Sequence, residues 1–182
     1  LMAATADRVP CVWIENQQVA NYDPSAPISV SYRTPFEGEP TGKNNPELLT
    51  KLKPSPNHGH NQAIVNGISR IGYMKGGGKA LWTDEFIADT IVAKTVQYIN
   101  KHKNEPFFLY VGTNDVHVPR YPNPRFAGKS GMGYRGDVIL QFDWTIGEIV
   151  KALKDNKIFA NTLLIVCSDN RPVIDDGNQD HA

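Results

Sequence analysis

Two short, unbroken runs of apolar residues stand out in the second half of the chain, at residues 107–111 and 163–167. Continuous apolar runs of this length are typical of strands that are buried on both faces, as in a parallel sheet. Each run follows a stretch in which apolar residues recur every three to four positions, the period of an amphipathic helix. The pattern therefore predicts two helices, each followed by a buried strand.

The predicted helices cover residues 82–103 and 136–156. The apolar face of the first consists of Ala88, Ile91, Val92, Thr95, Val96 and Ile99. The apolar face of the second consists of Ile139, Phe142, Ile146, Ile149, Val150 and Leu153. We expect Thr83 to cap the first helix. We also expect Asp143 to be buried beside the second face and to hold a neighbouring loop, because a buried carboxylate must be hydrogen-bonded.

Residues 1–81 lack helical periodicity and are rich in proline and glycine. X-Pro pairs recur from Asp23 to His60 and favour an irregular backbone. Residues 9–14 and 19–20 are expected to pair as a hairpin, and residues 64–79 to form a loop packed by its own apolar side chains. The chain is therefore expected to divide into an irregular segment, 1–81, and an α/β core, 82–182.

The order helix, strand, long loop, helix, strand is one repeat of an α/β sheet with right-handed crossovers. Two strands cannot form a sheet whose faces are both covered, so further strands must come from sequence outside these residues. We therefore expect the chain to be an internal fragment of a longer protein with a mostly parallel sheet flanked by helices.

Composition narrows the classes of function. The chain has 182 residues, of which 40% are hydrophobic and 21% charged, as in globular domains. The formal net charge is zero and no basic stripe is interleaved with aromatic residues, so no nucleic-acid partner is expected. No apolar run approaches the roughly 20 residues of a membrane span, so no membrane segment is expected in this chain. Cys11 and Cys167 are in no metal-binding or redox spacing.

Polar residues follow both predicted strands where each strand ends: His117 after the first, Asp169 and Asn170 after the second. Ligands of α/β sheets bind at the carboxyl ends of the strands, so we expect these side chains on one edge. Carboxylate and amide oxygens suit Ca²⁺ or Mg²⁺, and a histidine beside them could act as acid or base. The alternative is that Asp-Asn is a turn and His117 a surface-loop residue.

Other polar motifs carry weaker hypotheses. His58 and His60 flank a glycine and could hold a transition metal, although no third ligand is evident; a loop that binds substrate or its own backbone is the alternative. Four residues near the end could bind cations but are expected to be solvated turns: Asp175, Asp176, Asp180 and His181. The sequence contains no nucleophile elbow, phosphate-binding loop or dinucleotide fingerprint.

The second half of the chain carries several motifs in a fixed order. They are Pro-Phe-Phe-Leu-Tyr at 106–110, His-Val-Pro at 117–119, Gly-Lys-Ser-Gly at 128–131 with Gly-Asp at 136–137, Gln-Phe-Asp-Trp-Thr-Ile-Gly at 141–147 and Ser-Asp-Asn at 168–170. Together these motifs resemble those of the sulfatases. The resemblance runs from about Thr83 to Ala182. Residues 7–10 and 66–74 extend it and are most similar to bacterial arylsulfatase-like members. It implies part of an alkaline-phosphatase-like α/β fold.

The resemblance also implies a mechanism, in which a formylglycine made from Cys or Ser attacks the sulfur of a sulfate ester and a metal stabilises charged oxygens. By resemblance, Asp169 and Asn170 are two ligands of the catalytic calcium, with magnesium possible. His117 is implied to contact the ester and assist the leaving group, and Thr5 to touch the sulfate. The implied partner is a sulfated small molecule or glycan, and the implied location is periplasmic or secreted.

The chain departs from the family pattern in several places. The nucleophile motif Cys-x-Pro-Ser-Arg, the paired aspartate ligands and the Gly-Lys-Trp-His segment are absent and are expected before Leu1; a further lysine is expected beyond the last residue. Arg171 replaces the glycine that follows the Asp-Asn pair, and Asn114 stands where relatives often carry histidine. We therefore expect this chain alone to be inactive and to bind calcium poorly.

Two other hypotheses remain open. The chain could belong to a non-catalytic homologue that binds sulfated glycans, with Arg171 weakening the metal site. It could also belong to a metal-dependent phosphoesterase of the same superfamily, with His58 and His60 as ligands.

Overall fold

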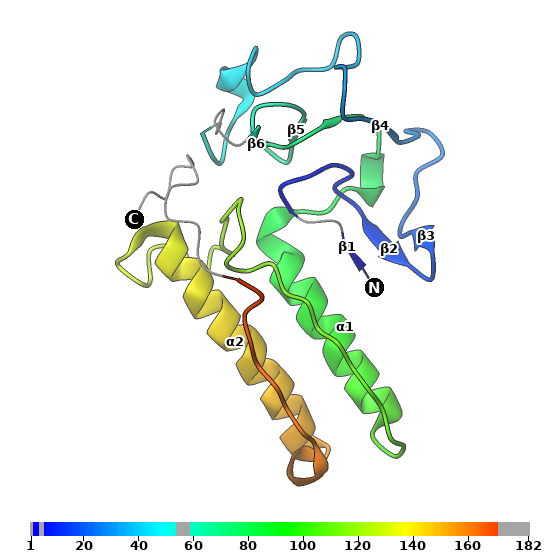
Figure 1. Ribbon diagram of the computed structural model, residues 1–182, viewed down its shortest axis with the longest axis vertical. Coiled ribbons are helices and arrows are strands. Elements are labelled where there is room, and N and C mark those ends of the chain that lie inside the picture. The colour runs from blue at the N-terminus through cyan, green and yellow to red at the C-terminus, as the bar shows by residue number, and fades with distance from the viewer. Residues whose placement is uncertain (1, 4–5, 54–58, 171–182) are drawn as a thin grey trace. The chain divides into compact units, whose positions relative to one another are not determined.

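The computed structural model describes residues 2–3, 6–53 and 59–170 of the chain (Figure 1). These residues form two compact units. Unit 1 comprises the described residues up to Asp84 together with His117–Tyr121, and unit 2 comprises Glu85–Val116 and the described residues from Pro122 onward. Each unit has its own buried side chains, and the two differ in the kind of element that supplies them.

Unit 1 contains three small antiparallel sheets. The first has the order β1 (Met2–Ala3), β2 (Trp13–Glu15), β3 (Gln18–Val19); the second pairs β4 (Ser29–Ser31) with β7 (Tyr73–Lys75); the third pairs β5 (Ile64–Val65) with β6 (Ile68–Ser69). The hairpin predicted near residues 9–20 is confirmed by β2 and β3. Its turn residues, Asn16 and Gln17, have φ angles of 50° and 66°, as a two-residue type I′ turn requires.

The prediction of a loop over residues 64–79 is wrong for the β5–β6 hairpin and for β7. Asn66 and Gly67 form the turn between β5 and β6, with φ angles of 54° and 72°. Asn-Gly is a strong hairpin signal. The flanking sequence does not reveal the hairpin, because each strand is only two residues long and shows no alternation of apolar and polar positions.

Unit 2 is built on two helices, α1 (Ile87–His102) and α2 (Gly133–Asp155). Four 3₁₀ helices complete the described elements of the two units. Unit 1 contains η1 (Pro46–Leu48) and η3 (Gly78–Ala80), η4 (Asp84–Phe86) lies where unit 1 passes into unit 2, and unit 2 contains η5 (Phe159–Asn161). Because η4 occupies the first turn, α1 begins four residues after the predicted cap Thr83. Its buried residues, which include Val92, Thr95 and Ile99, confirm the predicted apolar face. Within the described part of the chain, neither helix is long and apolar enough to cross a membrane.

The predicted apolar face of α2 is confirmed at Ile149 and Leu153, which are buried, but it differs in the first half of the helix. Ile139 is 52% exposed, and Asp143 is exposed rather than buried. Asp137, Gln141 and Thr145 are buried instead. The hydropathy pattern assigned these three residues to solvent because they are polar, whereas Asp137 and Gln141 make hydrogen bonds with neighbouring loops. The expectation that Asp143 holds a loop is therefore wrong, and Asp137 has that role.

The apolar core of unit 2 lies between the two helices and the segment that follows α1. Ile99 meets Ile149, Ala152 and Leu153 in one cluster. Phe107, Leu109 and Val111 pack against this cluster, whereas the alternate residues Phe108 and Tyr110 are 88% and 83% exposed. Residues 107–111 therefore have one covered face and one open face.

The predicted strands at 107–111 and 163–167 are extended segments without ladder partners among the described residues, and no parallel sheet is present there. Leu163 is 86% exposed, Ile165 73%, and Cys167 is exposed as well. Within the described residues, neither segment is buried on both faces, because no described strand pairs with either of them. The mostly parallel sheet that they were predicted to join stays a prediction.

Candidate functional site

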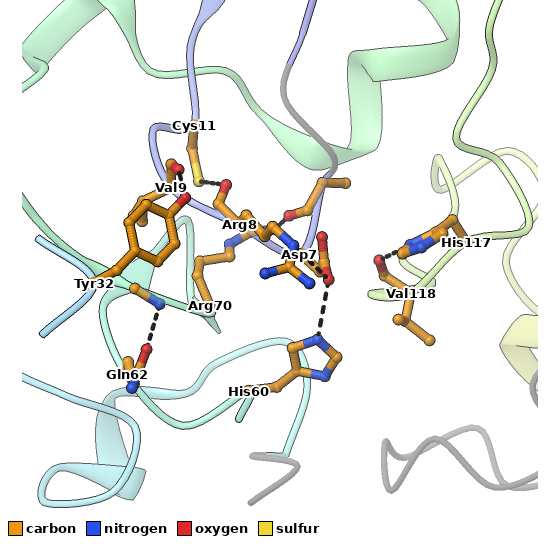
Figure 2. A network of polar contacts seen from close by, with 12 residues as sticks. Asp7, Arg8, Val9, Cys11, Tyr32, His60, Gln62, Arg70, His117 and Val118 are labelled. Atoms are coloured by element: carbon orange, nitrogen blue, oxygen red, sulfur yellow. Dashed lines mark hydrogen bonds and ion pairs between the residues drawn. The ribbon is translucent and has the colours of Figure 1, made fainter. Parts of the chain in front are cut away.

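His117 lies in unit 1, exposed, and is followed by three buried residues, of which Val118 is the first. Its Nδ1 atom lies 2.7 Å from the carbonyl oxygen of Val118 (Figure 2). A carbonyl oxygen can only accept, so Nδ1 carries the hydrogen and donates it. In the neutral ring, the lone pair is then on Nε2, which is the atom that can accept, hold or release a proton.

A second polar group of unit 1 surrounds Asp7, which the sequence had indicated only as part of a family-like stretch. Asp7 is buried, and its Oδ2 atom lies 3.5 Å from Nε2 of buried His60 and 3.7 Å from Nε of Arg8 (Figure 2). His58, the other half of the predicted metal pair, lies outside the described residues. No group of three or more metal-ligating acidic, histidine or cysteine residues occurs in the described ranges. The partner of His60 is the carboxylate of Asp7, and the two side chains form a polar contact between two loops.

The most deeply buried charge of unit 1 is Arg70, which is 0% exposed. Its two terminal nitrogens donate to the carboxylate of Asp84 at 2.9 and 2.7 Å, and also to the carbonyls of Ala6 at 2.6 Å and Val65 at 3.0 Å. Burial alone would lower the pKa of Arg70, but the charge and hydrogen bonds of Asp84, together with the nearby Cys11 and Asp7, outweigh burial and hold that pKa above its usual value. The bidentate pair joins three segments and fixes the backbone beside Asp7.

Asp169 and Asn170 lie in unit 2, exposed, after the extended segment 163–167. The hydroxyl of Ser168 donates to the carbonyl of Asn170 at 2.9 Å, which closes a local turn. Their side chains are hard oxygen donors of the type that Ca²⁺ prefers, but calcium takes about six to eight oxygens. The chemistry of these two side chains therefore fits a calcium site, but two ligands are only part of the set that calcium needs.

Other predicted site residues lie outside the described residues. They are Thr5, His58, Arg171, Asp175, Asp176, Asp180 and His181. The structure places His117 in unit 1 and the Asp169–Asn170 pair in unit 2. The expectation that they share one sheet edge stays a prediction.

The loop motif Gly-Lys-Ser-Gly at 128–131 is held by Asp137 in the first turns of α2. The carboxylate of Asp137 accepts hydrogen bonds from the backbone N–H of Gly128 at 2.7 Å and of Ser130 at 3.0 Å, and from the Ser130 hydroxyl at 2.7 Å. Burial raises the pKa of Asp137, but these hydrogen bonds together outweigh it and hold the pKa below its ordinary value. Two separate parts of the family-like pattern therefore meet at one carboxylate.

A buried polar network in unit 2 was not recognised from the sequence. Asp115, Asn123 and Gln141 are buried, and Asp115 and Asn123 are each hydrogen-bonded to the side chain of Gln141. Burial raises the pKa of Asp115, and the hydrogen bond from Gln141 opposes that rise only in part. The sequence feature that could have indicated this network is Gln141, a polar residue on the buried face of α2. It was overlooked because the hydropathy pattern placed position 141 on the solvent-exposed face.

Comparison with known proteins gives a consistent picture. The family described as Sulfatase matches residues 11–182. An N-acetylgalactosamine-6-O-sulfatase of Bacteroides thetaiotaomicron is 60% identical over 182 residues, which is 100% of this chain and 35% of that protein. Human arylsulfatase D is 35% identical over 86 residues, covering 47% of this chain and 14% of that protein.

A pig N-acetylgalactosamine-6-sulfatase is 40% identical over 67 residues, covering 37% of this chain and 13% of that protein. A solved sulfatase structure from work on glycosaminoglycan metabolism by Bacteroides thetaiotaomicron superposes with a TM-score of 0.92 at 61% identity, covering 97% of this chain and 36% of that one. This chain thus spans about a third of the length of the Bacteroides relatives, and the likeness extends over nearly all of it.

Proposed function

Because the chain belongs to the sulfatase family, we propose that the protein hydrolyses sulfate esters of glycans, and that its substrate is a 6-O-sulfate on N-acetylgalactosamine. The observation that carries this proposal is the 60% identity across the whole chain to an N-acetylgalactosamine-6-O-sulfatase. The matched region spans the whole chain and therefore includes the positions of His117 and of the Asp169–Asn170 pair. The activity of the whole protein is a proposal because the chain spans 35% of that relative.

We assign His117 the role of contacting the ester and protonating the leaving oxygen. The hydrogen bond from Nδ1 to the Val118 carbonyl, at 2.7 Å, supports this role because it fixes the ring and leaves Nε2 for proton transfer. A protonated Nε2 would donate its hydrogen to the oxygen of the departing sugar hydroxyl. The exposure of His117, beside buried neighbours, leaves that nitrogen accessible to a ligand.

We propose Asp169 and Asn170 as two of the oxygen ligands of a calcium ion. Bound calcium would supply positive charge that stabilises the oxygens of the sulfate group. The remaining ligands and the formylglycine nucleophile would come from residues outside this chain. The exposure of both side chains and their oxygen chemistry support the assignment.

The test is release of sulfate from defined monosaccharides by the full-length protein. N-acetylgalactosamine 6-sulfate is the expected substrate, with the 4-sulfate and N-acetylglucosamine 6-sulfate as comparisons. His117→Ala should lower kcat by about 10²–10⁴-fold, the usual contribution of a general acid. His102→Ala, at the end of α1, is the matched control and should be neutral. Hydrolysis of phosphate esters in place of sulfate esters would favour the phosphoesterase alternative, and an active His117→Ala protein would remove the role of His117.

Calorimetry on the 182-residue chain tests the metal assignment separately. We expect weak calcium binding, because two oxygen donors are far fewer than calcium requires. We also expect no sulfatase activity from this chain alone. Micromolar calcium binding that disappears in Asp169→Ala would show that the chain holds a complete site, contrary to this proposal.

A further inference from the structure

The segment that carries His117 begins and ends at one side chain of α2. Gln141, which is buried, donates from Nε2 to Oδ1 of Asp115 at 2.8 Å. Its Oε1 accepts from the backbone N–H of Asn123, also at 2.8 Å. The two ends of a single amide group therefore bind the residues on either side of the 116–122 segment.

The second attachment point, Asn123, is itself fixed to α1 and to η4, the short helix before it. Its side-chain nitrogen donates to the carbonyl of Glu85 at 2.9 Å and to Oδ2 of Asp89 at 3.2 Å. Its side-chain oxygen accepts from the backbone N–H of Arg125 at 3.1 Å. Because Asn123 is held by both helices of unit 2, the end of the 116–122 segment has little freedom to shift.

The bridge needs an amide at position 141. The Asp115 carboxylate requires a donor, whereas the Asn123 N–H requires an acceptor, and only a glutamine side chain of this length offers both. A glutamate of the same shape would accept from Asn123 but would place a second carboxylate against Asp115. A buried acceptor without a donor costs free energy, and two adjacent carboxylates repel each other.

We propose that Gln141 is a positioning residue: by joining Asp115 to Asn123, it fixes both ends of the segment that carries His117 and so sets the orientation of that histidine for hydrolysis of the sulfate ester. This inference rests on the proposed role of His117. Gln141 acts through the backbone on either side of the histidine and touches no reacting atom itself. Its effect is therefore expected in kcat more than in KM, because misplacing a catalytic group by about 1 Å can cost on the order of 100-fold in rate.

The test exchanges the two partners of the bridge in the full-length enzyme. Gln141→Glu should lower kcat by about 100-fold with a much smaller change in KM. The double variant Asp115→Asn/Gln141→Glu restores a donor facing an acceptor, with the amide now at position 115, and should recover kcat to within a few fold of the wild type. Asp115→Asn alone should be mild, since the introduced amide oxygen can still accept from Gln141. Asp143→Asn, on the exposed face of α2, is the control.

Amide hydrogen exchange on the full-length protein measures the bridge independently of activity. Residues 116–122 should exchange faster in Gln141→Glu and return to the wild-type rate in the double variant. If Gln141→Glu exchanges faster but keeps the wild-type kcat, the positioning role is overturned. It is also overturned if the double variant folds but its kcat stays as low as that of Gln141→Glu. If wild-type enzyme releases no sulfate, or if His117→Ala is fully active, the proposed function fails instead, and unchanged exchange in Gln141→Glu would refute the bridge by itself.

Discussion

The two units are held together by different physical means. Unit 1 is organised around Arg70 and Asp84, a fully buried ion pair whose guanidinium also binds two backbone carbonyls. Its strands are two or three residues long, so ladder hydrogen bonds are few. Unit 2 is organised around apolar side chains between α1 and α2, with Leu153 and Ile99 at its centre.

The difference between the two units indicates how a backbone of turns and short strands can be held in one conformation. A helix satisfies its own backbone groups, so α1 and α2 need only an apolar face to pack. A chain of short strands and turns leaves carbonyls that need donors, and one guanidinium with its five N–H groups supplies several of them at once. Unit 1 should therefore be most sensitive to loss of a charge, and unit 2 to loss of volume.

The largest effect is expected from Asp84→Ala. It leaves the guanidinium of Arg70 buried without its counter-charge, which typically costs about 3–5 kcal/mol. Urea unfolding followed by the fluorescence of Trp13 and Trp82, whose rings lie 5.7 Å apart in unit 1, measures the loss. Replacing both partners, Arg70→Met with Asp84→Leu, should recover most of it, since no charge is then stranded. An equally unstable double variant would mean that the carbonyl contacts of Arg70, rather than its charge, hold unit 1.

Leu153→Ala should have the next largest effect, on the order of 3 kcal/mol, because it removes buried apolar volume between the helices. Ile139→Ala on the same helix is the comparison. Ile139 is 52% exposed, so its truncation should change the free energy of unfolding by less than about 0.5 kcal/mol. Thermal unfolding followed by far-ultraviolet circular dichroism reports both. Equal losses of stability at the two positions would mean that Ile139 is buried, as the hydropathy pattern predicted.

Asp137→Asn should have a smaller effect that depends on pH. The pKa of Asp137 lies below its ordinary value of 3.8, so the ionised carboxylate stabilises the folded state at neutral pH. That contribution is complete above the ordinary value and is lost as pH falls through the lowered pKa of the folded state. The variant should be less stable than wild type at pH 7, with the difference shrinking in acid.

Asp143→Asn is the control for this pH dependence, and its free energy of unfolding should match that of wild type throughout, since Asp143 is exposed.

The contribution of Asp115 to the free energy of unfolding should depend on pH in the opposite sense, because burial raises its pKa. Its contribution favours the folded state below the ordinary value and declines as pH rises towards the raised pKa. A variant of Asp137 whose deficit is constant with pH would contradict the charge-based account.

The smallest effect concerns reactivity rather than stability. Burial is the main reason that the pKa of Cys11 is raised to about 11, whereas Cys167 is exposed. Since the thiolate is the nucleophile, iodoacetamide at pH 8 should label Cys167 in the native chain and both cysteines only in urea. Mass spectrometry of tryptic peptides counts the labels. Equal labelling of Cys11 in native conditions would show that unit 1 opens readily.

Local patterns in the sequence predicted those elements whose cause is local. The 3.6-residue period located α1 and α2 to within a few residues, and the turn at Asn16 and Gln17 fell where the hairpin was expected. Family-like motifs pointed to a sulfatase, which the family match confirms. The roles of His117, Asp169 and Asn170 stay predictions.

The tertiary structure decided which polar residues are buried and what they bind. Arg70 meets Ala6 across 64 positions, and Gln141 meets Asp115 across 26. Such contacts have no period along the chain, and a hydropathy pattern assigns their members to solvent, as it did for Asp137 and Gln141. The sequence by itself therefore determined the helices, a hairpin and the family, because these follow from short-range periodicity and ordered motifs. Only the fold decided that Asp137 rather than Asp143 holds the 128–131 loop, because burial of a charge depends on donors supplied from elsewhere in the chain.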